Sequence, residues 1–75
     1  MTQEQLKFII ETGKEFDFTV KRKKYLIYYS KTPEGKHLIH LSEDFIPIGT
    51  YESFTHLMTE AKIQNSFFKE VLNDL

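Results

Sequence analysis

Hydrophobic and polar residues alternate most regularly after the first dozen positions, where Phe16, Phe18 and Val20 occupy every second place. A period of two is typical of a β-strand with one buried face. A second run, Lys24 to Ser30, continues this alternation directly after a cluster of basic residues. The two runs therefore predict an antiparallel hairpin.

The register of this hairpin follows from its hydrophobic pattern. With a two-residue turn at Arg22 and Lys23, the opposed pairs are Val20 with Tyr25, Phe18 with Ile27 and Phe16 with Tyr29. A slip by one residue would scatter these side chains over both faces of the sheet. Arg-Lys lacks the Gly or Asn that a type I′ turn prefers, so a slightly longer loop is the alternative.

A third strand is expected from about Lys36 to Ser42. The preceding KTPEGK favours a type I turn with a bulge, because Pro33 presets φ and Gly35 accepts a positive φ. The predicted pairs are Thr32 with Lys36, Tyr29 with Ile39 and Ile27 with Leu41. The three strands would form an antiparallel meander.

Helices are predicted before and after the strands along the sequence. A capping box at Thr2 and Gln5 begins a helix over residues 3 to 12, and Gly13 is placed to end it. Ser53 caps a second helix, whose apolar positions are Phe54, Leu57, Met58 and Ala61. Asn65 interrupts the pattern, and a last helix repeats it at Phe68, Val71, Leu72 and Leu75.

Between the third strand and Ser53, the segment around Pro47 can be at most an edge strand or a covering loop. We therefore predict a single α+β domain over residues 1–75. It has an N-terminal helix, a three-stranded antiparallel meander and two C-terminal helices packed on one face of the sheet. The predicted core face consists of Phe16, Phe18, Tyr25, Ile27, Ile39 and Leu41.

Composition argues against a disordered, a disulfide-bonded and a membrane-spanning protein. Of the 75 residues, 40% are hydrophobic and 15% are aromatic, which is enough for a packed core and argues against disorder. The absence of cysteine excludes disulfides and thiol chemistry. The apolar runs are too short for a membrane span, and the polar MTQEQ start does not resemble a signal peptide, so we expect a cytosolic protein.

The second sheet face is the most informative surface. The predicted register places Thr19, Leu26, Tyr28, Leu38 and His40 there, with Tyr28 across from His40 on one side and Asp17 on the other. Either the segment 45–48 or a helix covers this face, or it is an interface. Our candidate partner-binding residues, for a protein partner or a second copy, are Leu26, Tyr28, Leu38 and His40.

The basic run in VKRKKYLIYY offers an alternative function. Lys21, Arg22, Lys23 and Lys24 could contact phosphates, with Tyr28 as a stacking surface for a base. The competing interpretation is a charged turn that keeps the hairpin soluble. A net charge of −1 leaves no large positive field for nucleic acid, which favours the charged turn.

Chemistry-bearing clusters are sparse. His37 and His40 point to opposite faces of one strand and cannot share a metal ion, while His56 lies on another element. Asp17, Tyr28 and His40 could approach one another, but no nucleophile or glycine-rich phosphate loop accompanies them. We predict no catalytic residue, metal or cofactor, and hence a non-enzymatic protein.

Two segments carry a resemblance to known proteins. GKEFDFTVKRKKYLIYY and SFTHLMTEAKIQNSFFKEVLNDL are similar to forms found in small phage and prophage proteins of Gram-positive bacteria. The resemblance brings no catalytic or ligand motif. It implies a small interaction or regulatory protein that binds a host or phage macromolecule.

Overall fold

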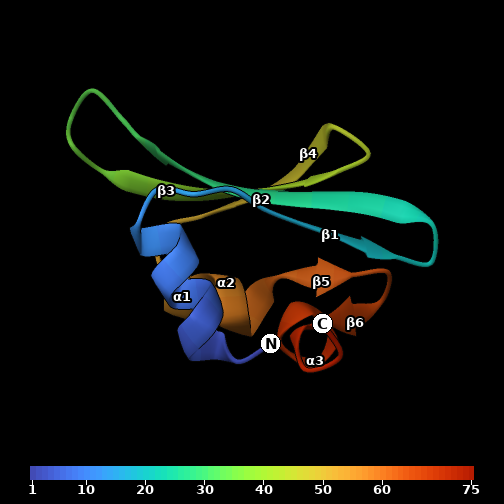
Figure 1. Ribbon diagram of the computed structural model, residues 1–75. Coiled ribbons are helices and arrows are strands. Elements are labelled where there is room, and N and C mark those ends of the chain that lie inside the picture. Colours follow the sequence, from blue (N-terminus) through green and yellow to red (C-terminus); the bar gives the residue numbers. More distant parts are fainter.

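A computed structural model describes residues 1–75 as an α+β fold of two layers (Figure 1). One layer is a four-stranded antiparallel sheet in the order β1-β2-β3-β4. Its strands are β1 (Phe16–Val20), β2 (Lys23–Lys31), β3 (His37–Glu43) and β4 (Ile46–Tyr51). The other layer holds α1 (Gln3–Glu11), α2 (Phe54–Glu60), α3 (Phe68–Leu72) and a small hairpin of β5 (Lys62–Ile63) and β6 (Ser66–Phe67).

α1 begins at the predicted residue and ends at Glu11, one residue before the predicted end. The Thr2 hydroxyl accepts a hydrogen bond from the Gln5 amide at 3.1 Å, and the Gln5 side chain accepts one from the Thr2 amide at 2.9 Å. At the other end, Gly13 has a φ of 76° and its N–H donates to the Ile10 carbonyl at 3.0 Å. Both ends of α1 are thus determined by local hydrogen bonds.

The predicted register of the first hairpin is wrong by two residues. The observed pairs are Phe16 with Ile27, Phe18 with Tyr25 and Val20 with Lys23. A shift of two keeps every side chain on its own face, so the hydrophobic pattern fits both registers equally well. The turn is therefore Lys21-Arg22 rather than Arg22-Lys23. Both residues adopt positive φ, 48° and 72°, as a type I′ turn requires.

The second hairpin confirms its prediction. Tyr29 pairs with Ile39 and Ile27 pairs with Leu41. In the turn, Gly35 has a φ of 86° and its N–H donates to the Thr32 carbonyl at 2.9 Å. Here the proline and glycine of the turn specify the register locally, as they do not in the first hairpin.

The sheet has a fourth strand where three were predicted. Of the two alternatives for the segment around Pro47, the edge strand is correct, because an edge position leaves the missing N–H of proline facing away from the ladder. Leu41 pairs with Gly49 and Ser42 with Pro47, which leaves Ile48 unpaired in a bulge.

The C-terminal part combines a confirmed cap with a hairpin that was not predicted. The Ser53 hydroxyl accepts from the His56 amide at 3.0 Å and begins α2 as expected. After α2 the chain turns through Gln64 (φ 51°) and Asn65 (φ 76°) to form the β5–β6 hairpin. The last helix, α3, ends at Leu72. None of the helices has the length and apolar character needed to cross a bilayer.

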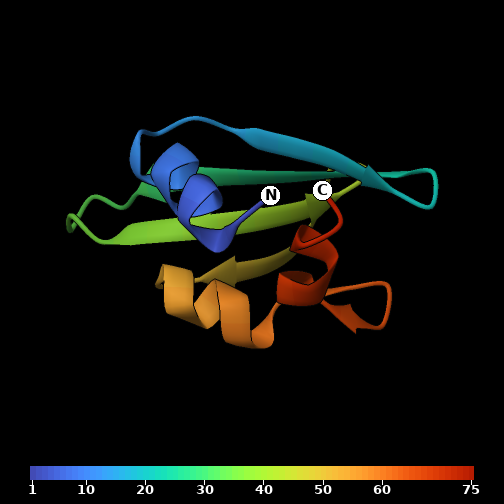
Figure 2. The same ribbon diagram turned by 60° about the horizontal axis from the view of Figure 1, so that its bottom comes forward.

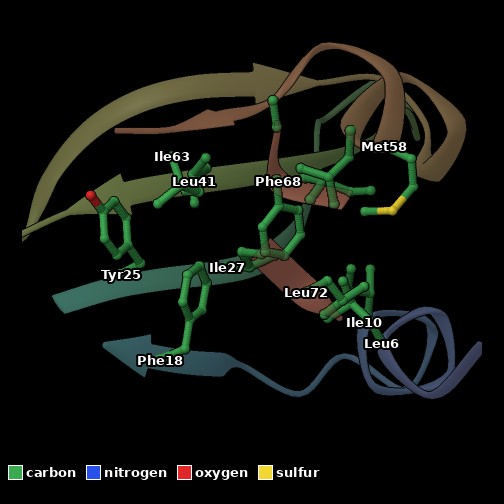
Figure 3. Close-up of a cluster of buried hydrophobic side chains, with 13 residues drawn as sticks. Leu6, Ile10, Phe18, Tyr25, Ile27, Leu41, Met58, Ile63, Phe68 and Leu72 are labelled. Carbon is green, nitrogen blue, oxygen red and sulfur yellow. The ribbon is translucent and has the colours of Figure 1, made fainter. Parts of the chain in front are cut away.

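The core lies between the sheet and the helical layer (Figure 3). Its buried hydrophobic residues are Leu6, Ile10, Phe18, Tyr25, Ile27, Ile39, Leu41, Leu57, Met58, Ala61, Ile63, Phe68 and Leu72. At its centre the Phe18 ring stacks on Tyr25, with centroids 5.2 Å apart, and on Phe68 at 5.4 Å. The predicted core face is confirmed, except that Phe16 is only half-buried.

Candidate binding surface on the open face of the sheet

One face of the four-stranded sheet is covered by no helix, and only the turn between β3 and β4 rises on that side in Figure 1. In Figures 1 and 2 all three helices and the β5–β6 hairpin lie on the same side of the sheet. Leu26, Tyr28, Leu38 and His40, which alternate with the buried residues of β2 and β3, point to the other side and are half-buried. We call the surface formed by these four residues the open face. The structure thus places them together as the sequence predicts.

The centre of the open face is an ordered aromatic pair. Tyr28 and His40 are opposite each other on β2 and β3, and their rings stack with centroids 4.7 Å apart and an interplanar angle of 16°. The His40 Nε2 lies 2.6 Å from the Ser30 hydroxyl, and its Nδ1 lies 3.5 Å from the Thr50 hydroxyl. Hydrogen bonds and stacking therefore hold both rings in place.

The expected pairing of Asp17 with Tyr28 is wrong. Because the first hairpin is shifted by two residues, Asp17 lies opposite Leu26 instead. The grouping of a carboxylate, Tyr28 and His40 that general-base chemistry would need is therefore not formed by Asp17 in this register. What the shift produces is an acidic residue at the margin of an apolar surface.

Beside Leu26 the surface is hollowed. A depression of about 520 Å³ is lined by Glu15, Asp17, Phe18, Thr19, Lys24, Tyr25, Leu26 and Phe45. Phe45, in the turn between β3 and β4, is 85% exposed, the largest exposure of any large hydrophobic residue here. Sequence reasoning missed Phe45 as a surface residue. Its only signal is an aromatic residue in a short turn, and the fold of that turn decides whether such a residue is buried.

The basic run is divided between two elements. Lys21 and Arg22 form the exposed turn, whereas Lys23 and Lys24 begin β2. The Lys23 Nζ lies 3.1 Å from the Glu43 carboxylate. The Lys24 amide donates to the Asp44 carboxylate at 3.0 Å. Carboxylates therefore accompany the basic run, which reduces its attraction for phosphate.

A polar cluster around Tyr25 joins the C-terminal hairpin to the sheet. The buried Tyr25 hydroxyl donates to Glu43 at 2.7 Å and accepts from the Gln64 amide group at 3.0 Å. The same Gln64 group donates to the Val20 carbonyl at 2.9 Å. This cluster fixes β5–β6 against the end of the first hairpin.

The pKa shifts in this cluster favour a charged Glu43, a charged Lys23 and a neutral Tyr25. The hydrogen bond from Tyr25, and then that from Lys23, lowers the pKa of Glu43 below its usual value. Hydrogen bonding to Glu43 raises the pKa of Lys23, and burial raises the pKa of Tyr25. At neutral pH the carboxylate and the ammonium are thus charged and the phenol is neutral, as a structural tether requires.

The other two histidines lie away from the open face. The His56 Nε2 is 2.7 Å from Glu60, and its Nδ1 accepts from the Glu52 amide at 3.3 Å. His37 contacts the Tyr29 hydroxyl. No three side chains of His, Asp or Glu come together in an arrangement that could hold a metal ion.

Comparison with protein-family models, with curated proteins and with solved structures gave no match. The interpretation of the open face therefore depends on its own geometry.

Proposed function

We propose that the protein is a non-enzymatic cytosolic interaction protein of phage or prophage origin, and that it binds a protein partner through the open face. The observation that supports this most directly is the one-sided arrangement of the fold. All helices lie on the opposite side of the sheet, yet Leu26, Tyr28, Leu38 and His40 form an apolar and aromatic surface (Figure 1). Surfaces of this kind are used for macromolecular contacts.

The fixed positions of the two rings in the aromatic pair favour binding. Tyr28 and His40 are already stacked, and hydrogen bonds to Ser30 and Thr50 orient the imidazole. A side chain that is immobilised before binding loses little entropy when the partner arrives. Tyrosine is also enriched among the residues that contribute most to binding. Tyr28 is therefore the expected anchor of the contact.

The rim of the surface favours a protein over a nucleic acid. Asp17 and Glu15 line the hollow beside Leu26, with Lys24 as the only basic residue in its lining. Carboxylates at this position would repel a phosphate backbone, whereas a mixed polar rim around an apolar centre is usual in protein interfaces. The exposed Phe45 ring extends the apolar area at the same margin.

The test compares two variants that each remove one aromatic ring. Proteins that bind the wild type in a bacterial lysate are identified by mass spectrometry, and the strongest is purified and titrated. Tyr28→Ser should weaken its binding about 30-fold, the effect of losing an anchor of about 2 kcal/mol. Phe8→Ser removes a ring that is 67% exposed on α1, on the other side of the molecule, and should leave the affinity unchanged.

Two results would contradict the proposal. Equal binding by Tyr28→Ser and the wild type, with circular dichroism showing both folded, would remove the open face as the site. Recovery of nucleic acid alone, released by moderate salt and lost in Arg22→Glu, would instead support the alternative function of the basic segment.

A further inference from the structure

The two edges of the sheet differ in how they are protected against pairing with another strand. β4 contains Pro47 and a bulge at Ile48, both of which interrupt a ladder of hydrogen bonds. β1, the opposite edge, has the sequence FDFTV with no proline, lysine or bulge. In Figure 2 no other element lies beyond β1. β1 thus lacks the proline and the bulge that interrupt β4, and its one charged residue is Asp17.

The backbone groups that β1 presents to solvent follow from its turn. In a hairpin closed by a two-residue turn, the flanking residues Val20 and Lys23 form a hydrogen-bonded pair, and hydrogen-bonded positions then alternate along the strand. Phe18 and Phe16 therefore direct their N–H and C=O groups toward β2. Asp17 and Thr19 direct theirs away from the sheet. These outward groups are free to bind a neighbouring strand.

We propose that β1 pairs with β1 of a second copy of this chain in an antiparallel arrangement centred on Phe18. This inference concerns a different surface from the open face and does not depend on the function proposed for it. The pairing places Asp17 opposite Thr19 of the partner subunit and Phe16 opposite Val20 of the partner subunit. All five residues of β1 then pair, and the outward groups of Asp17 and Thr19 form the hydrogen bonds.

Charge complementarity identifies a second copy as the occupant. Glu15 and Lys21 flank β1 directly at its two ends, so this register brings Glu15 next to the turn residue Lys21 of the partner subunit, and symmetry repeats the pair. A register centred on Asp17 would instead place two aspartates directly opposite, which is unfavourable. A register centred on Thr19 would leave part of β1 unpaired. The register centred on Phe18 thus combines complete overlap with two opposite-charge pairs.

The symmetry of the pairing has a consequence for the open face. The two-fold axis passes through Phe18 perpendicular to the sheet, so two four-stranded sheets become one continuous sheet of eight strands. Both open faces then lie on the same side, and both helical layers lie on the other. The half-buried rings of Phe16 gain cover from Val20 of the partner subunit.

Sedimentation and amide exchange test the edge contact directly. The wild type should show a reversible monomer–dimer equilibrium at millimolar concentration. The amides of Asp17 and Thr19 should become protected from hydrogen exchange as the concentration rises. Thr19→Pro removes an outward N–H without touching the bonds to β2, so it should abolish the dimer and leave the monomer folded. Thr19→Val keeps that N–H and should still dimerise.

Charge reversal tests the register. Glu15→Lys or Lys21→Glu alone places like charges opposite each other twice and should raise the dissociation constant about tenfold. The two changes together should restore it. A monomer at all concentrations, or a dimer that persists in Thr19→Pro, would overturn the proposal. A dimer abolished by Tyr28→Ser but not by Thr19→Pro would also overturn it, because self-association would then use the open face.

Discussion

Replacement of Tyr25 by phenylalanine isolates the link between the C-terminal hairpin and the sheet. The Tyr25 hydroxyl bonds to Glu43 at 2.7 Å and to Gln64 at 3.0 Å, and the side chain is only 1% exposed. After the change, Gln64 keeps its hydrogen bond to the Val20 carbonyl, and Glu43 keeps its ion pair with Lys23. Two lost hydrogen bonds of about 1 kcal/mol net each would cost about 2 kcal/mol, and the remaining partners of Gln64 and Glu43 offset part of this cost. We therefore expect Tyr25→Phe to lower the free energy of unfolding by about 1.5 kcal/mol.

The assay is urea unfolding followed by circular dichroism, supported by thermal unfolding. For a chain of this length a loss of about 1.5 kcal/mol corresponds to a decrease in Tm of about 10 °C. Tyr28→Phe is the matched control, because Tyr28 contacts His40 through its ring face rather than its hydroxyl. That variant should stay within about 0.5 kcal/mol of the wild type. Equal losses in the two variants would refute the structural role of the Tyr25 hydroxyl.

The pH dependence of Tyr25→Phe provides an independent check. Because the pKa of Glu43 is lower in the folded protein than its usual value of 4.5, its carboxylate stabilises the fold above that pH. This stabilisation disappears as the pH falls through the folded pKa. The largest cause of the lowered pKa of Glu43 is the hydrogen bond from Tyr25, which the variant lacks. The variant therefore loses less stability on acidification than the wild type does. The difference in stability between the wild type and Tyr25→Phe should therefore decrease below about pH 4.

Three further changes test packing and backbone conformation. Phe68→Ala empties a fully buried site and should cost about 3–5 kcal/mol, enough to unfold much of a small domain at 37 °C by circular dichroism. Arg22→Gly should raise the stability by about 0.5–1 kcal/mol, because Arg22 has a φ of 72° in a type I′ turn. Gly13→Ala should lower the stability by about 1 kcal/mol in thermal unfolding, since Gly13 has a φ of 76° and an added Cβ meets no atom within 4 Å. Changes of the same sign at Arg22 and Gly13 would contradict the backbone explanation.

The two sheet hairpins show how far a turn can be predicted from sequence. Pro33 and Gly35 specify the second turn, and the pairing of Tyr29 with Ile39 follows correctly. In the first hairpin neither Lys21 nor Arg22 has an intrinsic preference for positive φ. Two registers differing by two residues then satisfy the same hydrophobic pattern, and only the packing of the folded sheet selects between them.

The candidate site likewise contains residues that the sequence predicts and residues that it does not. Its four residues on β2 and β3 were predictable, because alternation alone assigns them to the face opposite Tyr25 and Ile27. Phe45 was not, because its exposure depends on the path of the turn between β3 and β4. The predicted partner of Asp17 was wrong because the register of the first hairpin was wrong, and that register decides which residue of β2 lies opposite Asp17.

By itself the sequence determined the α+β class, the ends of α1 and the side of the sheet on which each alternating residue lies. These features depend on capping, on periodicity and on turn residues, all of which act within a few positions of the chain. Only the tertiary structure decided that no helix covers the open face, which register the first hairpin adopts, and that Pro47 belongs to an edge strand. Those outcomes depend on contacts between distant segments, which local pattern cannot rank. The open face and the exposed edge of β1 are both consequences of that packing.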